Sequence, residues 1–312
     1  MNGPVTGTAR GPRVTPEAVI ERIESRWRVP FEGSLKQAPA QFEAPGDGGD
    51  WKERLEATRR ELRPFQRKLH AARQYSVLLI FQALDAAGKD GVIREVFEEL
   101  DPVNVEVHSF KAPSERERRH DFLWRTSRRL PGRGEIAVFN RSYYEEVLVV
   151  RVHPAFLSAQ YAGVAPDPDA LWPERYRAIR EHERHLALAN TLILKFWLNV
   201  SPARQAQRFL ERLDTPEKRW KFSLGDVRES GFREAYDAAL LHMLNETSRP
   251  WAPWFCIPAD DRWYLRWQVA DIFRQALAAL PLEYPPTEEI PPEQAAEVRA
   301  TLGARLEQKD GN

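Results

Sequence analysis

Residues 77–91 place an apolar run before a short loop that ends in Gly88-Lys89 and leads into a helical pattern at residues 92–100. This order of strand, glycine-lysine loop and helix is how a P-loop binds phosphate. Backbone N–H groups of the loop and of the helix N-terminus point at the anion, and the lysine adds a positive charge. The segment therefore predicts a phosphate site at the end of a buried strand.

The loop departs from the common P-loop pattern in two places. The first glycine of the pattern, which four residues separate from Gly88-Lys89, would fall at Ala83 or its neighbour and is absent. The Ser/Thr that ordinarily ligates magnesium after the lysine is replaced by Asp90, and a second acid, Asp85, lies inside the loop. A functional interpretation of the chain has to explain both departures.

Composition excludes several classes of protein. Of the 312 residues 42% are hydrophobic and 29% are charged, which is typical of a soluble globular protein. No apolar run approaches the roughly 18 residues that span a bilayer, and residues 1–13 do not resemble a signal peptide. The single cysteine, Cys256, fits a reducing compartment. The sequence predicts a cytoplasmic protein with no membrane partner.

Charge is neutral overall but basic in two patches. The formal net charge is zero, so bulk attraction to nucleic acid is not expected. Residues 111–133 nevertheless carry eight basic and three acidic side chains, and residues 201–221 carry six and three. Such patches suit a discrete anion site, and the alternative is that both are solvated helix faces.

Apolar segments with strand and helix periodicity alternate along the chain. This alternation predicts an α/β fold, a three-layer, doubly wound parallel sheet of about five strands. The expected strands are residues 76–82, 104–109, 135–139, 191–200 and 254–259. The main expected helices are 51–73, 88–100, 114–130, 140–150, 169–189, 202–213, 229–248 and 263–280.

Three regions are expected. Residues 1–50 are rich in Gly, Pro and Ala and predict a partly flexible N-terminal arm. Residues 51–285 are expected to form a P-loop domain, with a lid at about 204–226, and residues 286–312 a tail.

Polar residues follow the expected strand 135–139. Asn140 occupies the position where P-loop proteins carry the acid that holds magnesium, and Arg141 follows at once. Glu145 and Glu146 come one turn later. A strand end that is merely polar is the alternative.

Asp85 is the stronger candidate for a residue that acts directly on the metal or the phosphate. Magnesium prefers hard oxygen ligands, so a loop without Ser/Thr has to supply them from other residues. Asp85 could ligate the metal, accept a proton from an attacking phosphate oxygen, or simply cap the following helix.

A second basic segment has the pattern of a lid. Arg204, Arg208 and Arg212 lie at i, i+4 and i+8 on one helix face, and residues 218–221 add three more cations. Phosphoryl transfer depends on positioning and on cationic stabilisation of the equatorial oxygens, which a mobile basic segment can deliver.

At the level of motifs the chain resembles the family-two polyphosphate kinases. The match spans roughly residues 50–285, and the motifs keep their order and spacing. They are Asp85-Ala-Ala-Gly-Lys-Asp-Gly91, Phe110-Lys-Ala-Pro-Ser114, Asp121-Phe-Leu-Trp-Arg125, Phe139-Asn-Arg-Ser142, 147–152, Lys195-Phe-Trp197, 212–214, Lys218-Arg-Trp-Lys-Phe222, 225–226 and Ala252-Pro-Trp254.

The resemblance implies a thymidylate-kinase-like P-loop fold with a helical lid. It implies Mg²⁺-dependent transfer of a terminal phosphate between inorganic polyphosphate and a nucleotide, with Mn²⁺ as a substitute. Asn140 in place of Asp resembles the branch that accepts both nucleoside mono- and diphosphates. The implied partners are polyphosphate, adenine and optionally guanine nucleotides, and a second copy of the chain in a homodimer or homotetramer.

The resemblance also assigns roles by position. The catalytic set would be Asp85, Lys89, Arg141 and Glu146, and the metal ligands Asp85 and Glu146. The nucleotide contacts would be Asn140, Arg141, Ser142 and Tyr144. The phosphate and polyphosphate contacts would be Ala86, Ala87, Gly88, Lys89, Asp90, Gly91, Lys111, Arg125, Arg151, Arg208, Arg212, Lys218, Arg219 and Lys221.

Two other functions stay open on the sequence. An ATP-dependent nucleoside monophosphate kinase would share the loop and the lid, but the missing Ser/Thr and the acid in the loop count against it. A regulator that binds phosphate or nucleic acid without turnover would be compatible with the basic patches. It would leave the carboxylates of Asp85 and Glu146 unexplained, since they repel an anion unless a metal lies between.

Overall fold

The fold is seen in a computed structural model that describes residues 14–31, 33–46, 49–161, 166–286 and 290–307. The first 13 residues of the predicted arm, part of the proline-rich loop at 162–165 and the end of the tail lie outside these ranges. No helix within them is long and apolar enough to cross a membrane.

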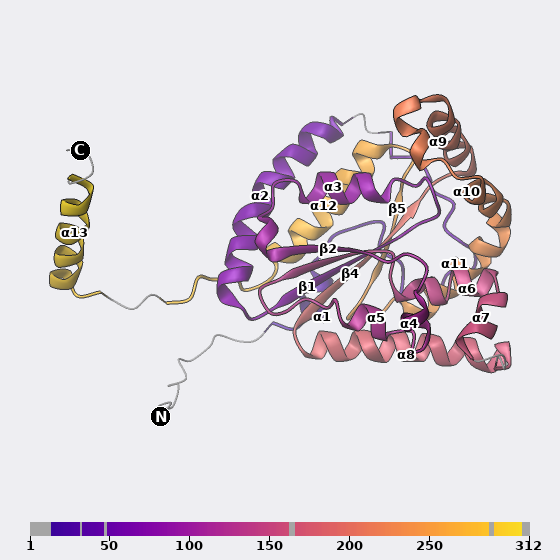
Figure 1. Cartoon of the computed structure of the whole chain (residues 1–312), viewed down its shortest axis with the longest axis horizontal. Coiled ribbons are helices and arrows are strands. Elements are labelled where there is room, and N and C mark those ends of the chain that lie inside the picture. The colour runs from indigo at the N-terminus through magenta and orange to yellow at the C-terminus, as the bar shows by residue number, and fades with distance from the viewer. Residues whose placement is uncertain (1–13, 32, 47–48, 162–165, 287–289, 308–312) are drawn as a thin grey trace.

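A five-stranded, all-parallel sheet has the strand order β2-β3-β1-β4-β5. Figure 1 shows this sheet at the centre of the domain, between the helices. This confirms the predicted α/β sheet. The strands are β1 Ser76–Gln82, β2 Val105–Ser109, β3 Ile136–Asn140, β4 Thr191–Asn199 and β5 Trp254–Pro258.

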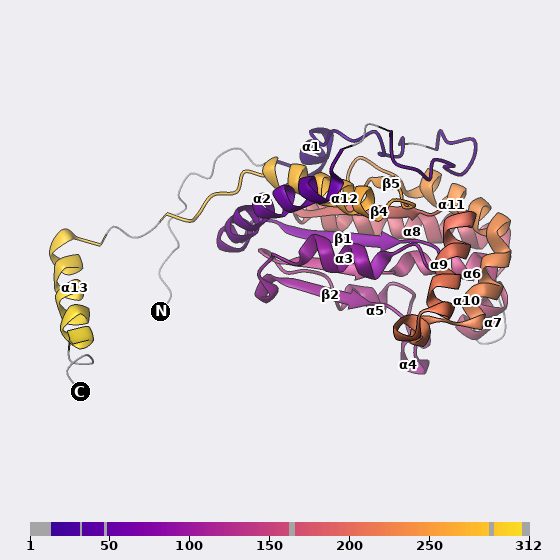
Figure 2. The same cartoon turned by 90° about the horizontal axis from the view of Figure 1, so that it is seen from above.

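Helices cover both faces of the sheet (Figures 1 and 2). The face of α1, α2, α3 and α12 packs as one buried cluster, and the face of α8 and α11 packs as another. The α-helices are α1 Pro16–Glu21, α2 Trp51–Ala72, α3 Lys89–Phe97, α4 Glu115–Arg118, α5 Trp124–Ser127, α6 Val149–Val152, α7 Ala155–Gln160, α8 Pro168–Leu188, α9 Pro202–Asp214, α10 Leu224–Glu229, α11 Arg233–Thr247, α12 Arg262–Ala278 and α13 Pro292–Glu307. Short 3₁₀ turns are η1 Pro102–Asn104, η2 Tyr143–Glu146, η3 Pro216–Lys221 and η4 Ser230–Phe232.

The two central strands explain why the sheet forms here. Every residue of β1 and β4 is buried. Successive residues of β1 alternate between the two faces, with Leu79 and Phe81 in one cluster and Leu78 and Ile80 in the other. A continuous apolar run is what a parallel strand covered on both faces requires.

Two expected helices are shorter and broken. The expected helix 114–130 is two separate turns, α4 and α5, although Ser114 and Glu117 form a capping box at the start of α4. The break comes where the Asp121 carboxylate accepts the N–H of Leu123 at 2.9 Å, because such a local bond competes with helix continuation. The expected helix 140–150 is η2 followed by α6, since Arg141 adopts a left-handed φ of 64°.

The described part of the arm packs on the domain. Its residues Val19, Ile20 and Ile23 are at most 1% exposed. Beyond α1 the arm pairs with the free edge of β5, where Val29 N–H donates to Trp254 O at 2.8 Å and Cys256 N–H donates to Trp27 O at 2.9 Å. The arm thus completes one edge of the sheet.

This docking predicts that Ile23→Ala destabilises the protein by about 2–4 kcal/mol, because it opens a cavity in a packed site. Chemical unfolding measures the loss. Glu24→Ala is the matched control, since the neighbouring side chain is exposed and its loss should have little effect. Equal effects of the two substitutions would contradict a docked arm.

Candidate active site

The loop between β1 and α3 has P-loop geometry. Gly88 is the N-cap residue of α3 with a φ of 102°, a left-handed conformation that suits glycine. Ala86 is also left-handed, with a φ of 62°, which is strained for a residue with a Cβ. Such strain persists only where surrounding contacts enforce the loop conformation.

Those contacts come from α9, which holds the loop by its backbone carbonyls. Gln205 Nε2 donates to Asp85 O at 2.9 Å. Arg208 Nη1 donates to Ala86 O at 3.0 Å and to Ala87 O at 2.9 Å, and its Nη2 donates to Ala259 O at 2.8 Å. Burial lowers the pKa of Arg208 to about 10. Arg208, which was predicted to bind phosphate, therefore supports the loop backbone, and it also lines the cavity over the loop.

The turn after β3 brings a second cation to the loop. Arg141 Nη2 donates to Asp85 Oδ1 at 2.9 Å, and Arg141 Nη1 lies 3.3 Å from Glu145 Oε2. The Glu145 carboxylate raises the pKa of Arg141 most, burial opposes this, and Asp85 raises it further. Asn140 Nδ2 donates to Asp90 Oδ1 at 2.8 Å. The predicted neighbours Asp85, Asn140 and Arg141 are therefore brought together.

Lys89 lies at the start of α3 and points back at the loop. Its Nζ donates to Ala83 O at 3.0 Å. Burial and the nearby Arg141 lower the pKa of Lys89, while Asp85 raises it. A phosphate oxygen entering the loop would replace a carbonyl oxygen as the partner of this ammonium.

A cavity of about 910 Å³ opens over the loop, between α9, η3, the start of α12 and residues 109–112. Ten cationic and four acidic side chains line it. The predicted phosphate residues Ala86, Ala87, Gly88, Asp90, Gly91, Lys111, Arg212, Lys218 and Lys221 are among its walls.

Arg262 and Arg266 also line this cavity and were missed by the sequence reasoning. They lie at i and i+4 at the beginning of α12, directly after the carboxyl end of β5. Because parallel strands end at the same edge of a sheet, this spacing was the available signal.

Several predicted contact residues lie elsewhere. Arg125 is 8% exposed and donates to Lys111 O at 2.6 Å, behind the cavity wall. Arg151 donates to Tyr176 Oη at 2.9 Å, and Arg219 Nε donates to Leu213 O at 3.1 Å. Neither Arg151 nor Arg219 lines the cavity over the loop.

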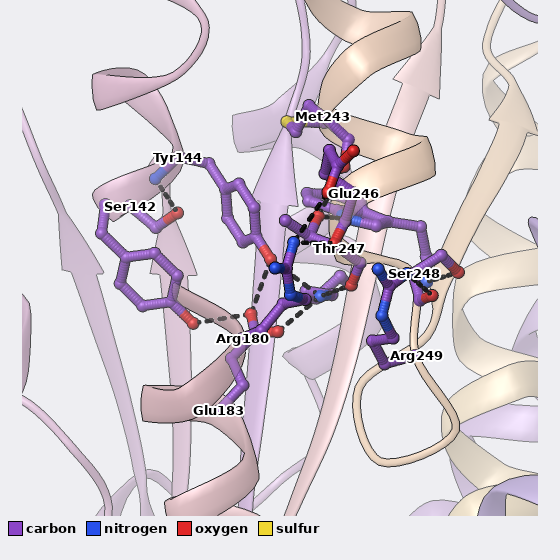
Figure 3. Close-up of polar contacts among 12 residues, drawn as sticks. Ser142, Tyr144, Arg180, Glu183, Met243, Glu246, Thr247, Ser248 and Arg249 are labelled. Carbon is purple, nitrogen blue, oxygen red and sulfur yellow. Dashed lines mark hydrogen bonds and ion pairs between the residues drawn. The ribbon is translucent and has the colours of Figure 1, made fainter. Parts of the chain in front are cut away.

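Two predicted nucleotide contacts are part of the interior. Ser142 and Tyr144 are fully buried. Ser142 Oγ accepts the N–H of Tyr144 at 3.2 Å, so it caps η2 (Figure 3). The Tyr144 hydroxyl belongs to a buried polar cluster rather than to the cavity surface.

Glu146 is separated from Asp85. It is 4% exposed, pairs with Arg175 at 3.4 Å and accepts from Gln160 Nε2 at 2.6 Å. It lines a second cavity of about 220 Å³, while its neighbour Glu145 shares a small pocket with Asp85 and Asp226. The orientation of η2 therefore directs Glu145 and not Glu146 toward the loop.

The acids at the loop fit a divalent cation. Burial raises the pKa of Asp226, and the negative charge of Asp85 raises it further, so the two carboxylates repel each other. Within the described ranges no three His, Cys, Asp or Glu side chains form a complete metal cage. Magnesium commonly takes one or two carboxylates together with substrate phosphates and water, and Asp85 facing the phosphate cavity suits that donor set.

Comparison with known proteins decides the family. The sequence model of the family described as Polyphosphate kinase 2 (PPK2) matches residues 47–283, which include all five strands and the cavity over the loop. The chain belongs to the polyphosphate kinase 2 family. The resemblance seen in the motifs is thereby confirmed.

Relatives within this family are similar over most of their length. The ADP-polyphosphate phosphotransferase of Rhodopseudomonas palustris is 47% identical over 72% of this chain and 78% of its own. The AMP/ADP-polyphosphate phosphotransferase of Meiothermus ruber is 45% identical over 76% and 84%. The crystal structure of polyphosphate kinase 2 from Arthrobacter aurescens TC1 superposes with a TM-score of 0.75 at 34% identity, covering 87% of this chain and 97% of that one.

The contacts of Arg208 predict that Arg208→Lys destabilises this family member by about 2 kcal/mol. A single ammonium cannot replace charge-assisted bonds made by two nitrogens of a planar fork. Arg204→Lys on the same helix is the control, because Arg204 contacts side chains such as Gln207 and Glu211. Guanidinium unfolding of both variants measures the difference, and equal midpoints would contradict a supporting role of Arg208.

Proposed function

We propose that the protein transfers the terminal phosphoryl group of inorganic polyphosphate to nucleoside mono- and diphosphates, converting AMP to ADP and ADP to ATP. The observation that carries this proposal is the cavity lined by ten cationic and four acidic side chains over a P-loop. A long polyanion needs a row of cations, whereas one nucleotide needs a single phosphate pocket. The names of the relatives supply the same donor and acceptors.

The residues at the loop divide the work as follows. Lys89 and the loop N–H groups bind the phosphate in transfer, and Arg141 neutralises the charge on its equatorial oxygens. Asp85 faces the same oxygens, as metal ligand or as acceptor of a proton from the attacking phosphate. A bound divalent cation, Mg²⁺ with Mn²⁺ as a substitute, would draw charge from the bridging oxygens. Glu145 and Asp226 line the same small pocket as Asp85 and would act with it toward the metal. The role of Glu146 as a metal ligand stays a prediction from the motif.

The reaction exchanges one phosphoanhydride for another. The terminal P–O bond of polyphosphate breaks, a P–O bond to the acceptor's terminal phosphate forms, and the donor chain becomes one phosphate shorter. Because bond types match, the direction depends on concentrations. Guanine nucleotides as further acceptors, a homodimer or homotetramer, and a place in the cytoplasm complete the proposal.

The first test uses the purified protein with a divalent cation, ADP and polyphosphate, and no ATP. ATP should form, and AMP in place of ADP should yield ADP, as measured by nucleotide chromatography. A panel that adds GMP and GDP ranks the acceptors. If phosphate transfer to AMP requires ATP as donor and polyphosphate is inert, the protein is instead a nucleoside monophosphate kinase.

Asp85→Asn is the matched variant for this assay. It keeps the shape of the loop side chain and removes the charge that faces the phosphates, so turnover should fall at least about 100-fold. Binding of polyphosphate should persist. Unchanged turnover would limit the role of Asp85 to its ion pair with Arg141.

Salt dependence tests the row of cations. Affinity for long-chain polyphosphate should fall steeply between low and physiological salt, by at least about tenfold, because counterions return to the chain. The affinity for tripolyphosphate, which spans fewer of the cations, should fall less over the same range of salt. Filter binding at a series of salt concentrations measures both slopes, and equal slopes would contradict an extended binding surface.

A further inference from the structure

A buried ion pair lies directly behind the turn that carries Arg141 and Glu145. Lys195 on β4 and Glu183 on α8 are both 0% exposed, and Lys195 Nζ lies 2.7 Å from Glu183 Oε2. Burial acts to raise the pKa of Glu183 and to lower that of Lys195, and the pairing opposes both shifts. Neither group touches the cavity over the loop.

Two consecutive tyrosines of η2 complete this pair. Figure 3 labels one of them, Tyr144, together with Glu183. The hydroxyls of Tyr143 and Tyr144 donate to Glu183 Oε1 at 2.9 and 2.7 Å. Lys195 Nζ donates to Tyr144 Oη, to Glu183 Oε2 and to Thr247 O, each at 2.7 Å. All three donors of the ammonium are therefore used, and its charge is fully compensated.

A buried ion pair is in general weak evidence of a contribution to stability. Hydrophobic residues of similar volume commonly stabilise a core as well as or better than a buried ion pair does. Buried hydrogen bonds have fixed directions, and they therefore give the groups that they hold a unique orientation. The groups held here are the side chains of Tyr143 and Tyr144, which come between two charged residues of the site.

The turn itself needs such support. Arg141 has a left-handed φ of 64°, and its guanidinium bonds to Asp85 and Glu145 on either side. Ser142 is already bonded to the N–H of Tyr144 at 3.2 Å. The backbone of Arg141 is held at one point, where its N–H donates to Phe81 O at 3.0 Å. Without support for the residues of η2 that follow, the turn could still rotate and change the direction of the Arg141 guanidinium and the Glu145 carboxylate.

We propose that Tyr144, fixed by Lys195 and Glu183, is a positioning residue that orients the turn with Arg141 and Glu145 toward the phosphate in transfer. The proposal rests on the function proposed above for its kinetic readout. Tyr144 acts through Arg141 and does not touch the substrate. Small displacements of catalytic groups are costly, since a shift of about 1 Å can reduce the rate 100-fold.

The test is Tyr144→Phe, which keeps the ring and removes the hydroxyl. The kcat for ATP formation from ADP and polyphosphate should fall about tenfold, while KM for both substrates stays within about twofold. Tyr75→Phe is the matched control. Tyr75 is also a buried tyrosine, 2% exposed, and its hydroxyl donates to Val14 O at 2.8 Å, far along the sheet from the turn. The control should leave kcat unchanged.

A double-mutant cycle with Arg141→Ala separates positioning from a general loss of structure. If Tyr144 acts through Arg141, Tyr144→Phe should add no further loss of kcat in the Arg141→Ala background. Independent, multiplying losses would overturn the proposal. Should Tyr144→Phe fail to fold, Tyr143→Phe leaves every Lys195 bond in place and should show the same pattern at about threefold.

Hydrogen exchange of the ligand-free protein gives an answer that does not depend on the reaction. Amides in residues 140–146 should exchange about tenfold faster in Tyr144→Phe than in the wild type, with no such change in Tyr75→Phe. Unchanged exchange at the turn would overturn the positioning role even if the enzyme is active. Absence of polyphosphate-dependent turnover in the wild type would instead contradict the proposed function and leave this readout standing.

Discussion

The attachment of the phosphate loop to α9 is the interaction on which the site depends. Gln205 and Arg208 bind the carbonyls of Asp85, Ala86 and Ala87, and Arg208 also binds a carbonyl beyond β5. One helix therefore fixes the loop conformation, including the strained Ala86, and ties it to the end of a different strand. The basic segment continues from α9 through η3 and α10. The helix that holds the loop is therefore also the start of the segment that carries the lysines of η3 over the cavity.

Much of this arrangement could be predicted from the sequence. The central strands β1 and β4 follow from largely apolar runs, since a strand covered on both faces needs few polar residues, whereas the exposed edge strand β2 alternates. The glycine-lysine loop predicts a phosphate site. The motifs added the family. Helical periodicity predicted two helices that are too long. One is interrupted by the hydrogen bond at Asp121 and the other by the left-handed Arg141, because such a local feature outweighs a weak helix propensity.

The site was less predictable at the level of single side chains. Glu145 and Glu146 are adjacent acids, and only the rotation of a 3₁₀ turn decides which of them faces the loop. Arg208 and Arg125 are of the residue type that binds phosphate, and their guanidinium groups donate to backbone carbonyls in this structure. A cation next to a phosphate site can support the backbone or meet the anion, and the sequence does not distinguish the two uses.

The pairing of the arm with β5 has a consequence for how copies of the chain behave at high concentration. A strand at the edge of a sheet presents unpaired N–H and C=O groups, which can template intermolecular strand pairing. Residues 27–29 satisfy two such groups on β5. At the opposite edge, β2 carries the exposed charge of Glu106 instead. Residues 27–29 therefore leave fewer groups of β5 available to pair with a strand of another molecule.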